Sequence, residues 1–277
     1  MKPLFKRTLS AAAILALLLG GLLVSPWIYA AVAAFAMLSM IVEYFKLNVS
    51  GPRYSREKAC IYVSATLLFC AAFFVLKSGI GIKWLLAAIF PLLICQCFML
   101  SDCRKDFDLN MHIFFPLIYI AAPICLSVPL VFPREEFNGT LLLAIYAIAW
   151  LNDVGAYIVG MSFGQRPDSL KLAPELSPKK SWAGVAGGTV FSFATATLAW
   201  KLFGAQFFPF VHWMVIAALI SVFGVCGDLF ESLIKRHSSV KDSSNFIPGH
   251  GGMLDRFDDI LFVIPAVTVY VKLFELV

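Results

Sequence analysis

The sequence predicts an all-α integral membrane protein with about nine transmembrane helices, its N-terminus in the cytoplasm and its C-terminus outside. Of the 277 residues, 60% are hydrophobic and 14% are charged, whereas soluble domains carry about 25% charged residues. Apolar runs of about 18 residues or more, each long enough to cross a bilayer, recur along the chain. These runs are continuous and lack two-residue alternation, which favours helices over a closed β-barrel.

The spans follow from the apolar runs in chain order. The first run comes after Lys6 and Arg7, as in a signal peptide, but it is long and no clean small-residue cleavage site ends it. We therefore expect a retained helix. In the first half of the chain the charges lie at helix ends, where Lys and Arg anchor a span at the membrane surface. The expected spans are 8–25, 27–45, 59–77, 81–100, 111–132, 139–162, 183–203, 211–234 and 259–276.

Basic residues divide unevenly between the two sides of the membrane that these spans imply. Most of the 22 Lys and Arg residues fall at the N-terminus or in every second loop after it. The positive-inside rule places that side in the cytoplasm. An odd number of spans agrees with a C-terminus outside. The basic residues on the other side are Lys77, Lys83, Arg134, Lys201 and Lys272.

The chain divides by chemistry into two regions. Residues 1–135 carry few polar groups within their spans and are expected to form a scaffold of N-terminal transmembrane helices. Residues 136–277 contain two long polar loops, 163–182 and 235–258, which the charge rule places in the cytoplasm. A membrane protein without a soluble domain must do its cytoplasmic work in such loops, so this region is the expected catalytic one.

The first candidate for chemistry begins inside a span and continues into the loop after it. Asp153 falls mid-span, where an ionisable group costs about 2.5–3.5 kcal/mol and so has a functional or pairing reason. In "SPKKSW", Ser177 or Ser181 is expected to cap the next helix. Lys179 and Lys180 oppose the dipole of that helix unless an anion binds there, which points to phosphate. Helix packing for Asp153 and a membrane anchor for the lysines are the alternatives.

The second candidate begins on the eighth span. Asp228, Glu231, Ser232 and Lys235 share one helix face at i, i+3, i+4 and i+7. Further polar residues follow in "KRHSSVKD".

A glycine-rich turn and three carboxylates complete this candidate. "PGHGG" is expected to be a tight turn that brings backbone N–H groups near a ligand. Asp255, Asp258 and Asp259 are expected to open the ninth helix on one face. A single carboxylate there is favoured by the helix dipole, but three repel one another unless a cation or Arg256 intervenes. Asp259 is the one expected to be only a helix-start charge.

The two loops combine the charge types that phosphoryl or nucleotidyl transfer requires. Carboxylates bind Mg²⁺ through hard oxygen ligands, while Lys and Arg bind phosphate oxygens. His250 has no His or Cys partners at zinc spacing, which argues against zinc. The sequence has no GxxxxGK[ST] motif, which argues against an ATP-driven transporter.

The segment "SLIKRHSSVKDSSNFIPGHGGMLDRFD", residues 232–258, resembles the signature of the phosphatidate cytidylyltransferase (CDP-diacylglycerol synthase) family. That signature runs S-x-x-K-R, four residues, K-D, then a linker to H-G-G-x-x-D-R-x-D. The segment from Asp153 to Gly188 also resembles the family in its D-x-x-A-Y, G-x-x-F-G and S-P-K-K-[TS]-W elements. One departure is Ala183, where the family often has Glu.

The resemblance implies a reaction between CTP and phosphatidic acid at the surface of the lipid bilayer, giving CDP-diacylglycerol and pyrophosphate. It implies Mg²⁺, with K⁺ as a candidate second cation, and a homodimer with candidate contacts in the N-terminal region. The expected location is the cell (inner or plasma) membrane, multi-pass, with the active site facing the cytoplasm. No nucleic acid partner is expected.

By the same resemblance, the functional residues fall into three groups. The expected metal ligands are Asp228 and Asp255. The expected substrate-binding residues are Lys179, Lys180, Ser177, Ser232, Arg256 and Asp153. The expected catalytic residues are Lys235, Arg236, Lys241, Asp242, His250 and Asp258, with the lysines and Arg236 on phosphates and His250 orienting a phosphate or a carboxylate.

Two alternatives remain open. Another membrane phosphotransferase that acts on a lipid phosphate would need the same metal and basic residues. A cation transporter could use Asp153 and Asp228 as ligands within the membrane, but it would leave the basic loop of the signature without a role.

Overall fold

The computed structural model describes residues 16–49, 54–78, 91–95, 97, 107–166, 168–240, 243–244 and 251–276. The chain folds as two compact units. The first comprises Met1–Phe137 and Asp242–Arg256, and the second comprises Asn138–Lys241 and Phe257–Val277. The short segment Asp242–Arg256 therefore belongs with the N-terminal half of the chain, although it comes near the C-terminal end of the sequence.

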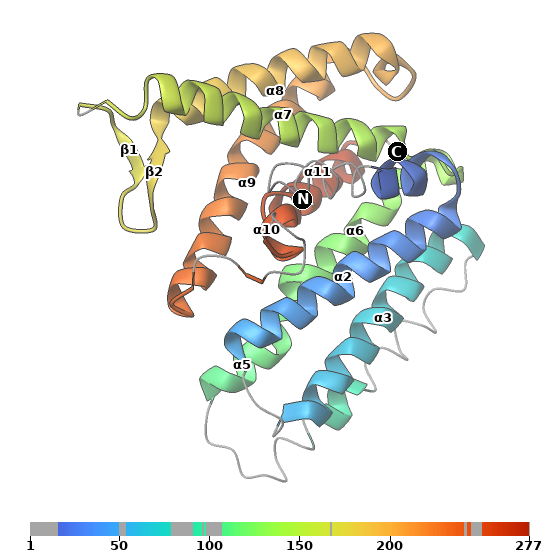
Figure 1. The fold of residues 1–277 in the computed structure, drawn as a ribbon. Helices are drawn as coiled ribbons and strands as arrows, with labels where there is room; N and C mark the ends of the chain where they lie inside the picture. The colour runs from blue at the N-terminus through green and yellow to red at the C-terminus, as the bar shows by residue number, and fades with distance from the viewer. Residues whose placement is uncertain are drawn as a thin grey trace, which may run out of the picture. The chain divides into compact units, whose positions relative to one another are not determined.

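The first unit is helical in the residues described. Its elements are α2 (Pro26–Asn48), α3 (Ser55–Ser78), α5 (Phe107–Pro116), the π-helix η2 (Leu117–Ala121), α6 (Ala122–Val131) and the 3₁₀ turn η3 (Pro133–Glu135). Helix α2 starts where Ser25 accepts a hydrogen bond from the Trp27 N–H at 3.3 Å and Pro26 occupies the first turn. Helices α2 and α3 lie side by side (Figure 1).

The core of this unit is apolar, with a few polar pairs. Met37, Met40 and Ile41 on α2 are fully buried. The Tyr29 hydroxyl lies 2.6 Å from the hydroxyl of Ser127. Because lipid offers no hydrogen-bonding partner, such pairing satisfies polar groups that the bilayer would leave without one.

The second unit packs three long helices with a fourth, shorter one. It contains α7 (Thr140–Ser162), β1 (Lys171–Ala173), β2 (Ser177–Ser181), α8 (Trp182–Leu202), η4 (Gly204–Gln206), α9 (Phe210–His237) and α11 (Ile260–Leu273). The four-residue helix α10 (Leu254–Phe257) spans the boundary between the units. Figure 1 shows α7 and α8 side by side over most of their length.

Small residues allow α7 and α8 to approach closely. A Cβ added to Gly155 would meet the ring of Phe191, and one added to Gly188 would lie 2.8 Å from Oδ1 of Asn152. Buried Asn152 ties three helices together, since its Oδ1 accepts hydrogen bonds from Ser192 Oγ on α8 at 3.1 Å and from Ser221 Oγ on α9 at 3.4 Å. Small residues and buried polar links of this kind are typical of helix packing in membranes.

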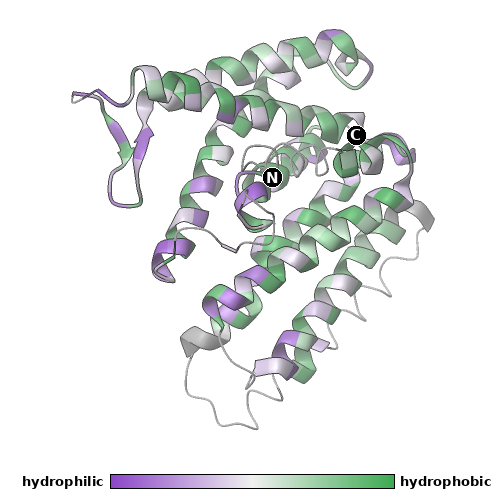
Figure 2. Ribbon diagram, in the orientation of Figure 1, coloured by the Kyte–Doolittle hydropathy of each residue, from purple (hydrophilic) through white to green (hydrophobic). Residues whose placement is uncertain are grey.

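The prediction of an all-α membrane protein is confirmed. The described residues include six helices long and apolar enough to span a bilayer, and they match six of the expected spans to within a few residues. Hydrophobic residues dominate these helices, whereas hydrophilic ones gather on the β1–β2 hairpin and at the C-terminal end of α9 (Figure 2). The six are Pro26–Asn48, Ser55–Phe74, Met111–Val131, Thr140–Ser162, Trp182–Leu202 and Phe210–His237.

The count of nine spans and the orientation stay predictions. The expected span 8–25 is described from residue 16 onward, where residues 16–23 are helical, and the expected span 81–100 lies largely outside the described residues. The expected span 259–276 corresponds to α11, which has 14 residues. At about 1.5 Å per residue it is roughly 21 Å long, shorter than a hydrocarbon core of about 30 Å.

The antiparallel hairpin β1–β2 was not expected from the sequence. Lys171 pairs with Ser181 and Ala173 with Ser177. Ser181 then caps α8 by accepting a hydrogen bond from the Gly184 N–H at 3.2 Å, so of the two expected caps Ser181 is confirmed. Strand β2 therefore leads directly into α8.

Candidate functional site

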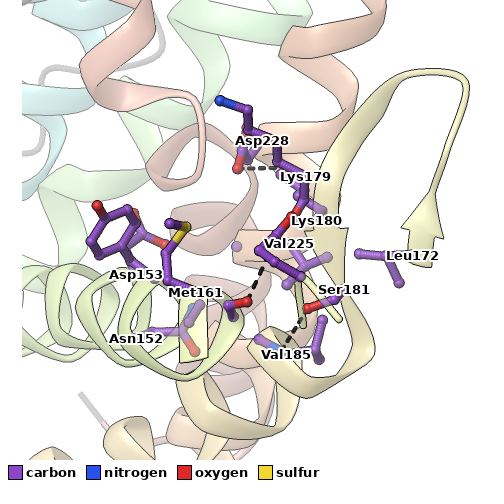
Figure 3. A pocket seen from close by; sticks show the side chains of 16 residues that line it. Asn152, Asp153, Met161, Leu172, Lys179, Lys180, Ser181, Val185, Val225 and Asp228 are labelled. Carbon is purple, nitrogen blue, oxygen red and sulfur yellow. Dashed lines mark hydrogen bonds and ion pairs between the residues drawn. The ribbon is translucent and has the colours of Figure 1, made fainter. Parts of the chain in front are cut away.

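A cavity of about 360 Å³ lies within the second unit, between α7, α8, α9 and the hairpin. Figure 3 shows the side chains of Asp153, Lys180 and Asp228 around it. Asp153 and Tyr157 come from α7, Lys179 and Lys180 from β2, and Asp228 from α9. The cavity therefore combines carboxylates, lysines and an apolar wall.

An ion pair in this cavity joins the hairpin to α9. Lys180 Nζ lies 2.5 Å from Oδ2 of Asp228, and their side chains are 22% and 42% exposed. A partly exposed ion pair contributes little to stability, so its value lies in holding both groups at the cavity. The base of the hairpin is fixed by Gln165, whose Nε2 donates to the Lys179 carbonyl at 2.8 Å.

Three carboxylates form an acidic cluster beside this cavity. Asp228, Glu231 and Asp258 each offer an oxygen, and these oxygens lie within 4.8 Å of one another. Glu231 is fully buried and forms an ion pair with Lys235 one turn later on α9. Asp258 comes from the turn between α10 and α11.

This turn reaches the cluster because α9 has a glycine where the two meet. A Cβ on Gly227 would overlap the carbonyl oxygen of Asp258 and would lie 3.0 Å from Cα of Asp259. Any larger residue would push the turn away from α9. The glycine therefore sets the distance between Asp258 and the carboxylates of α9.

The electrostatics of the cluster favour a bound cation. Desolvation, together with the nearby carboxylates of Asp228 and Asp153, raises the pKa of Asp258 to about 7. Carboxylates this close cannot all ionise freely without a compensating charge. The donor set, three carboxylate oxygens from two elements, fits a divalent cation that prefers hard oxygen ligands.

The expectation that Asp255, Asp258 and Asp259 open one helix is wrong. Asp255 lies in α10, and the chain turns at Asp258 and Asp259 before α11 begins at Ile260. Asp259 caps α11, because its Oδ1 accepts a hydrogen bond from the Ile260 N–H at 2.8 Å. Its expected position at the start of the helix is confirmed.

Asp255 belongs to the first unit, where it holds a local turn. Its Oδ2 accepts hydrogen bonds from Ser243 N at 2.9 Å, Ser243 Oγ at 2.9 Å and Gly252 N at 2.8 Å. Gly251 has a φ of 81°, a conformation that glycine adopts at little cost. The expected glycine turn is present, and the role of Asp255 as a metal ligand stays a prediction.

The remaining predicted residues are spread over both units. Ser177 begins β2, Ser232 and Arg236 lie on the last turns of α9, and Arg256 is exposed on α10. Lys235 is engaged with Glu231. Lys241, Asp242 and His250 lie outside the described residues.

Two carboxylates, one in each unit, receive no role from the sequence pattern. The sequence places Glu231 on the same helix face as Asp228, and no role is predicted for it. The signal for a shared site is its spacing of three residues from Asp228. Glu43, on α2, is almost completely buried and binds the segment around Gly252. No local pattern in the sequence marks it.

Comparison with known proteins shows the family of the chain. The chain matches the model of the cytidylyltransferase family over residues 5–274. It is 44% identical over 141 residues to the phosphatidate cytidylyltransferase of Bacillus subtilis, a match that covers 51% of each chain. It is 46% identical over 128 residues to that of Pseudomonas aeruginosa, covering 46% of this chain and 45% of the relative.

A longer match extends the similarity. The chain is 30% identical over 210 residues to the phosphatidate cytidylyltransferase of Rickettsia typhi, which covers 74% of this chain and 83% of the relative. The chain spans about half the length of the first relatives it matches. Since the family model matches nearly from end to end, the chain belongs to the cytidylyltransferase family.

Proposed function

We propose that this membrane protein transfers a cytidylyl group from CTP to phosphatidic acid, giving CDP-diacylglycerol and pyrophosphate. A phosphate oxygen of the lipid forms a bond to the α-phosphorus of CTP while the bond between the α- and β-phosphates breaks, and pyrophosphate leaves with that electron pair. The nucleophile is already anionic, so the reaction needs no covalent protein intermediate. Positioning and charge neutralisation supply the rate.

One observation carries the proposal: in a chain of the cytidylyltransferase family, the cavity brings Lys180 to Asp228 beside the acidic cluster. Lysines at a cavity wall bind phosphate oxygens as point charges. We assign Lys179 and Lys180 to the phosphates of CTP. An incoming phosphate replaces Asp228 as the partner of Lys180, which leaves that carboxylate for a cation.

The acidic cluster would hold a divalent cation, which we propose is Mg²⁺, with K⁺ as the candidate second cation. Asp228, Glu231 and Asp258 supply its oxygen ligands. When bound, the cation neutralises negative charge that develops on the phosphates. The lysines do the same from the hairpin side, so positive charges hold the triphosphate from two sides and keep the α-phosphorus in place.

Further roles in the proposal rest on the family resemblance. Arg236, Lys241 and Arg256 bind phosphates, and Ser177, Ser232 and Asp153 bind substrate. His250 and Asp242 orient groups of the site, and Asp255 contributes to metal binding. We further propose that the site faces the cytoplasm, as the distribution of basic residues predicts, and that the protein is a homodimer.

The test is conversion of labelled CTP into a chloroform-soluble product by the purified protein with Mg²⁺. We expect product only when phosphatidic acid is present. Reaction with a UDP-sugar instead would favour a sugar-phosphate transferase, and cation flux into liposomes without nucleotide would favour a transporter. Either result, with no CTP-dependent product, would overturn the proposal.

Lys180→Gln tests the assignment within the cavity. A charge-assisted hydrogen bond is worth about 1.5–3 kcal/mol, so we expect kcat/KM for CTP to fall about 10- to 100-fold. Lys201→Gln is the matched control, because Lys201 lies in the last turn of α8, at the end of the helix opposite Lys180. Equal effects of the two substitutions would refute the role of Lys180.

A further inference from the structure

A buried carboxylate on α2 holds the glycine-rich segment of the first unit. Glu43 is 3% exposed. Its Oε1 accepts hydrogen bonds from Met253 N at 2.9 Å and Ser244 Oγ at 2.6 Å. Its Oε2 accepts a hydrogen bond from Leu254 N at 2.8 Å and lies 3.2 Å from Ser243 Oγ, whose single proton it shares with Asp255.

These four contacts satisfy both oxygens of a group that would otherwise be costly to bury. They also satisfy two backbone N–H groups of the segment, at Met253 and Leu254. A carboxylate suits this position because all of its lone pairs accept. An apolar residue, as found along most of α2, would leave these N–H groups without an acceptor.

The same contacts connect Glu43 to Asp255. The hydroxyl of Ser243 lies between the two carboxylates, at 3.2 Å from Oε2 of Glu43 and 2.9 Å from Oδ2 of Asp255. Gly252 passes so close that an added Cβ would lie 2.5 Å from Oε2 of Glu43. Hydrogen bonds therefore hold the segment on two sides, to Asp255 within it and to Glu43 on α2.

We propose that Glu43 is a positioning residue, which fixes the segment from Gly252 to Asp255 against α2 and thereby orients Asp255 and Arg256 for nucleotidyl transfer. The inference rests on the proposed function for its effect on catalysis. Glu43 is buried, and its hydrogen bonds go to the segment. It acts through the segment that it holds.

Glu43→Gln is the test, because the two side chains have the same shape. Whichever way the amide turns, its nitrogen faces either Met253 N or Leu254 N, so one N–H group loses its acceptor. We expect kcat to fall about 10- to 100-fold, since displacements of about 1 Å can cost that much, with KM for CTP within about threefold. Backbone amide exchange at residues 251–255 should become at least tenfold faster.

Two further variants separate positioning from folding. Glu57→Gln is the matched control, since Glu57 is also a buried carboxylate of the first unit, on the first turn of α3; it should leave kcat and amide exchange at residues 251–255 unchanged. Ser244→Ala removes one donor to Glu43 and keeps the carboxylate, so a smaller effect of the same kind is expected. In a double-mutant cycle, Glu43→Gln and Ser243→Ala should be non-additive because they share one contact.

Several results would overturn the inference: an unchanged kcat in Glu43→Gln, a loss of kcat without faster local exchange, or equal losses in Glu57→Gln. The exchange measurement is made without substrate. If the parent protein lacks CTP-dependent activity, the proposed function fails, and the exchange measurement still decides whether Glu43 holds the segment.

Discussion

Gly227→Ala should disrupt the acidic cluster without altering any of its charged groups. The added methyl would overlap the backbone carbonyl oxygen of Asp258 and lie 3.0 Å from Cα of Asp259 and 3.2 Å from the carbonyl carbon of Asp258. These atoms belong to the backbone, so no change of rotamer relieves the contact. Restoring a distance of about 3.4 Å to the Cα alone requires a movement of roughly 0.4 Å, and the overlap with the oxygen requires more.

The loss of stability expected from this clash can be separated from the intrinsic stabilising effect of alanine in a helix. Overpacking of this kind costs about 1–3 kcal/mol, while replacing glycine by alanine inside a helix stabilises by up to about 1 kcal/mol. Gly224→Ala, one turn earlier on α9, provides the reference, because its added methyl finds its nearest atoms at 3.9 Å. The difference in stability between the two variants, about 1–3 kcal/mol, then measures the clash.

The assays are thermal unfolding in detergent and CTP-dependent product formation, with Mg²⁺ varied. For Gly227→Ala we expect a lower melting temperature, weaker Mg²⁺ activation and kcat reduced by up to about 100-fold. Gly224→Ala should keep a melting temperature at or above that of the parent. If Gly227→Ala matched Gly224→Ala in both assays, the close approach of the turn to α9 would have no role in building the cluster.

Two other substitutions test the interior of the second unit. Asn152→Leu should lower the free energy of unfolding by about 1–3 kcal/mol, because Ser192 and Ser221 lose their common acceptor. Thr197→Val, at another site on α8, serves as the control in thermal unfolding. An equal loss of stability in that variant would contradict the prediction. Since the pKa of Asp258 is raised to about 7, the folded metal-free protein holds a proton that the unfolded chain releases above about pH 4. Its melting temperature in chelator should therefore fall as the pH rises from about 5 to 8. Mg²⁺ should reverse the fall and Asp258→Asn should reduce it. A melting temperature that rises over this range would refute the assignment.

The sequence predicts the membrane class and six spans well because hydrophobic runs need no tertiary information. It also predicts local features, such as the cap at Ser181, the glycine turn at Gly251 and the helix-start role of Asp259, since each depends on neighbours within a few residues. The hairpin was missed because "SPKKS" has no alternating pattern. The strands pair with each other in the segment that leads into α8.

The site itself is less predictable, since its parts come from distant segments. The break between α10 and α11 moves Asp258 away from the helix that holds Asp255, and no residue type announces it. The approach that brings Asp258 to Asp228 depends on one glycine of α9. Glu43 appears in the sequence as one acidic residue in a mostly apolar helix, and only the folded chain reveals the donors that surround it.

The contacts of Glu43 also set an order for biogenesis. Glu43 and the Met253 N–H that it binds are 210 residues apart in the chain, so at about 5–20 residues per second α2 is made roughly 10–40 s before its partner leaves the ribosome. During that interval the carboxylate must be accommodated by other means, such as water at the membrane surface. A fragment that ends before residue 242 would keep this carboxylate permanently without the segment, so the N-terminal half should need the C-terminal segment, supplied in cis or in trans, to complete its own fold.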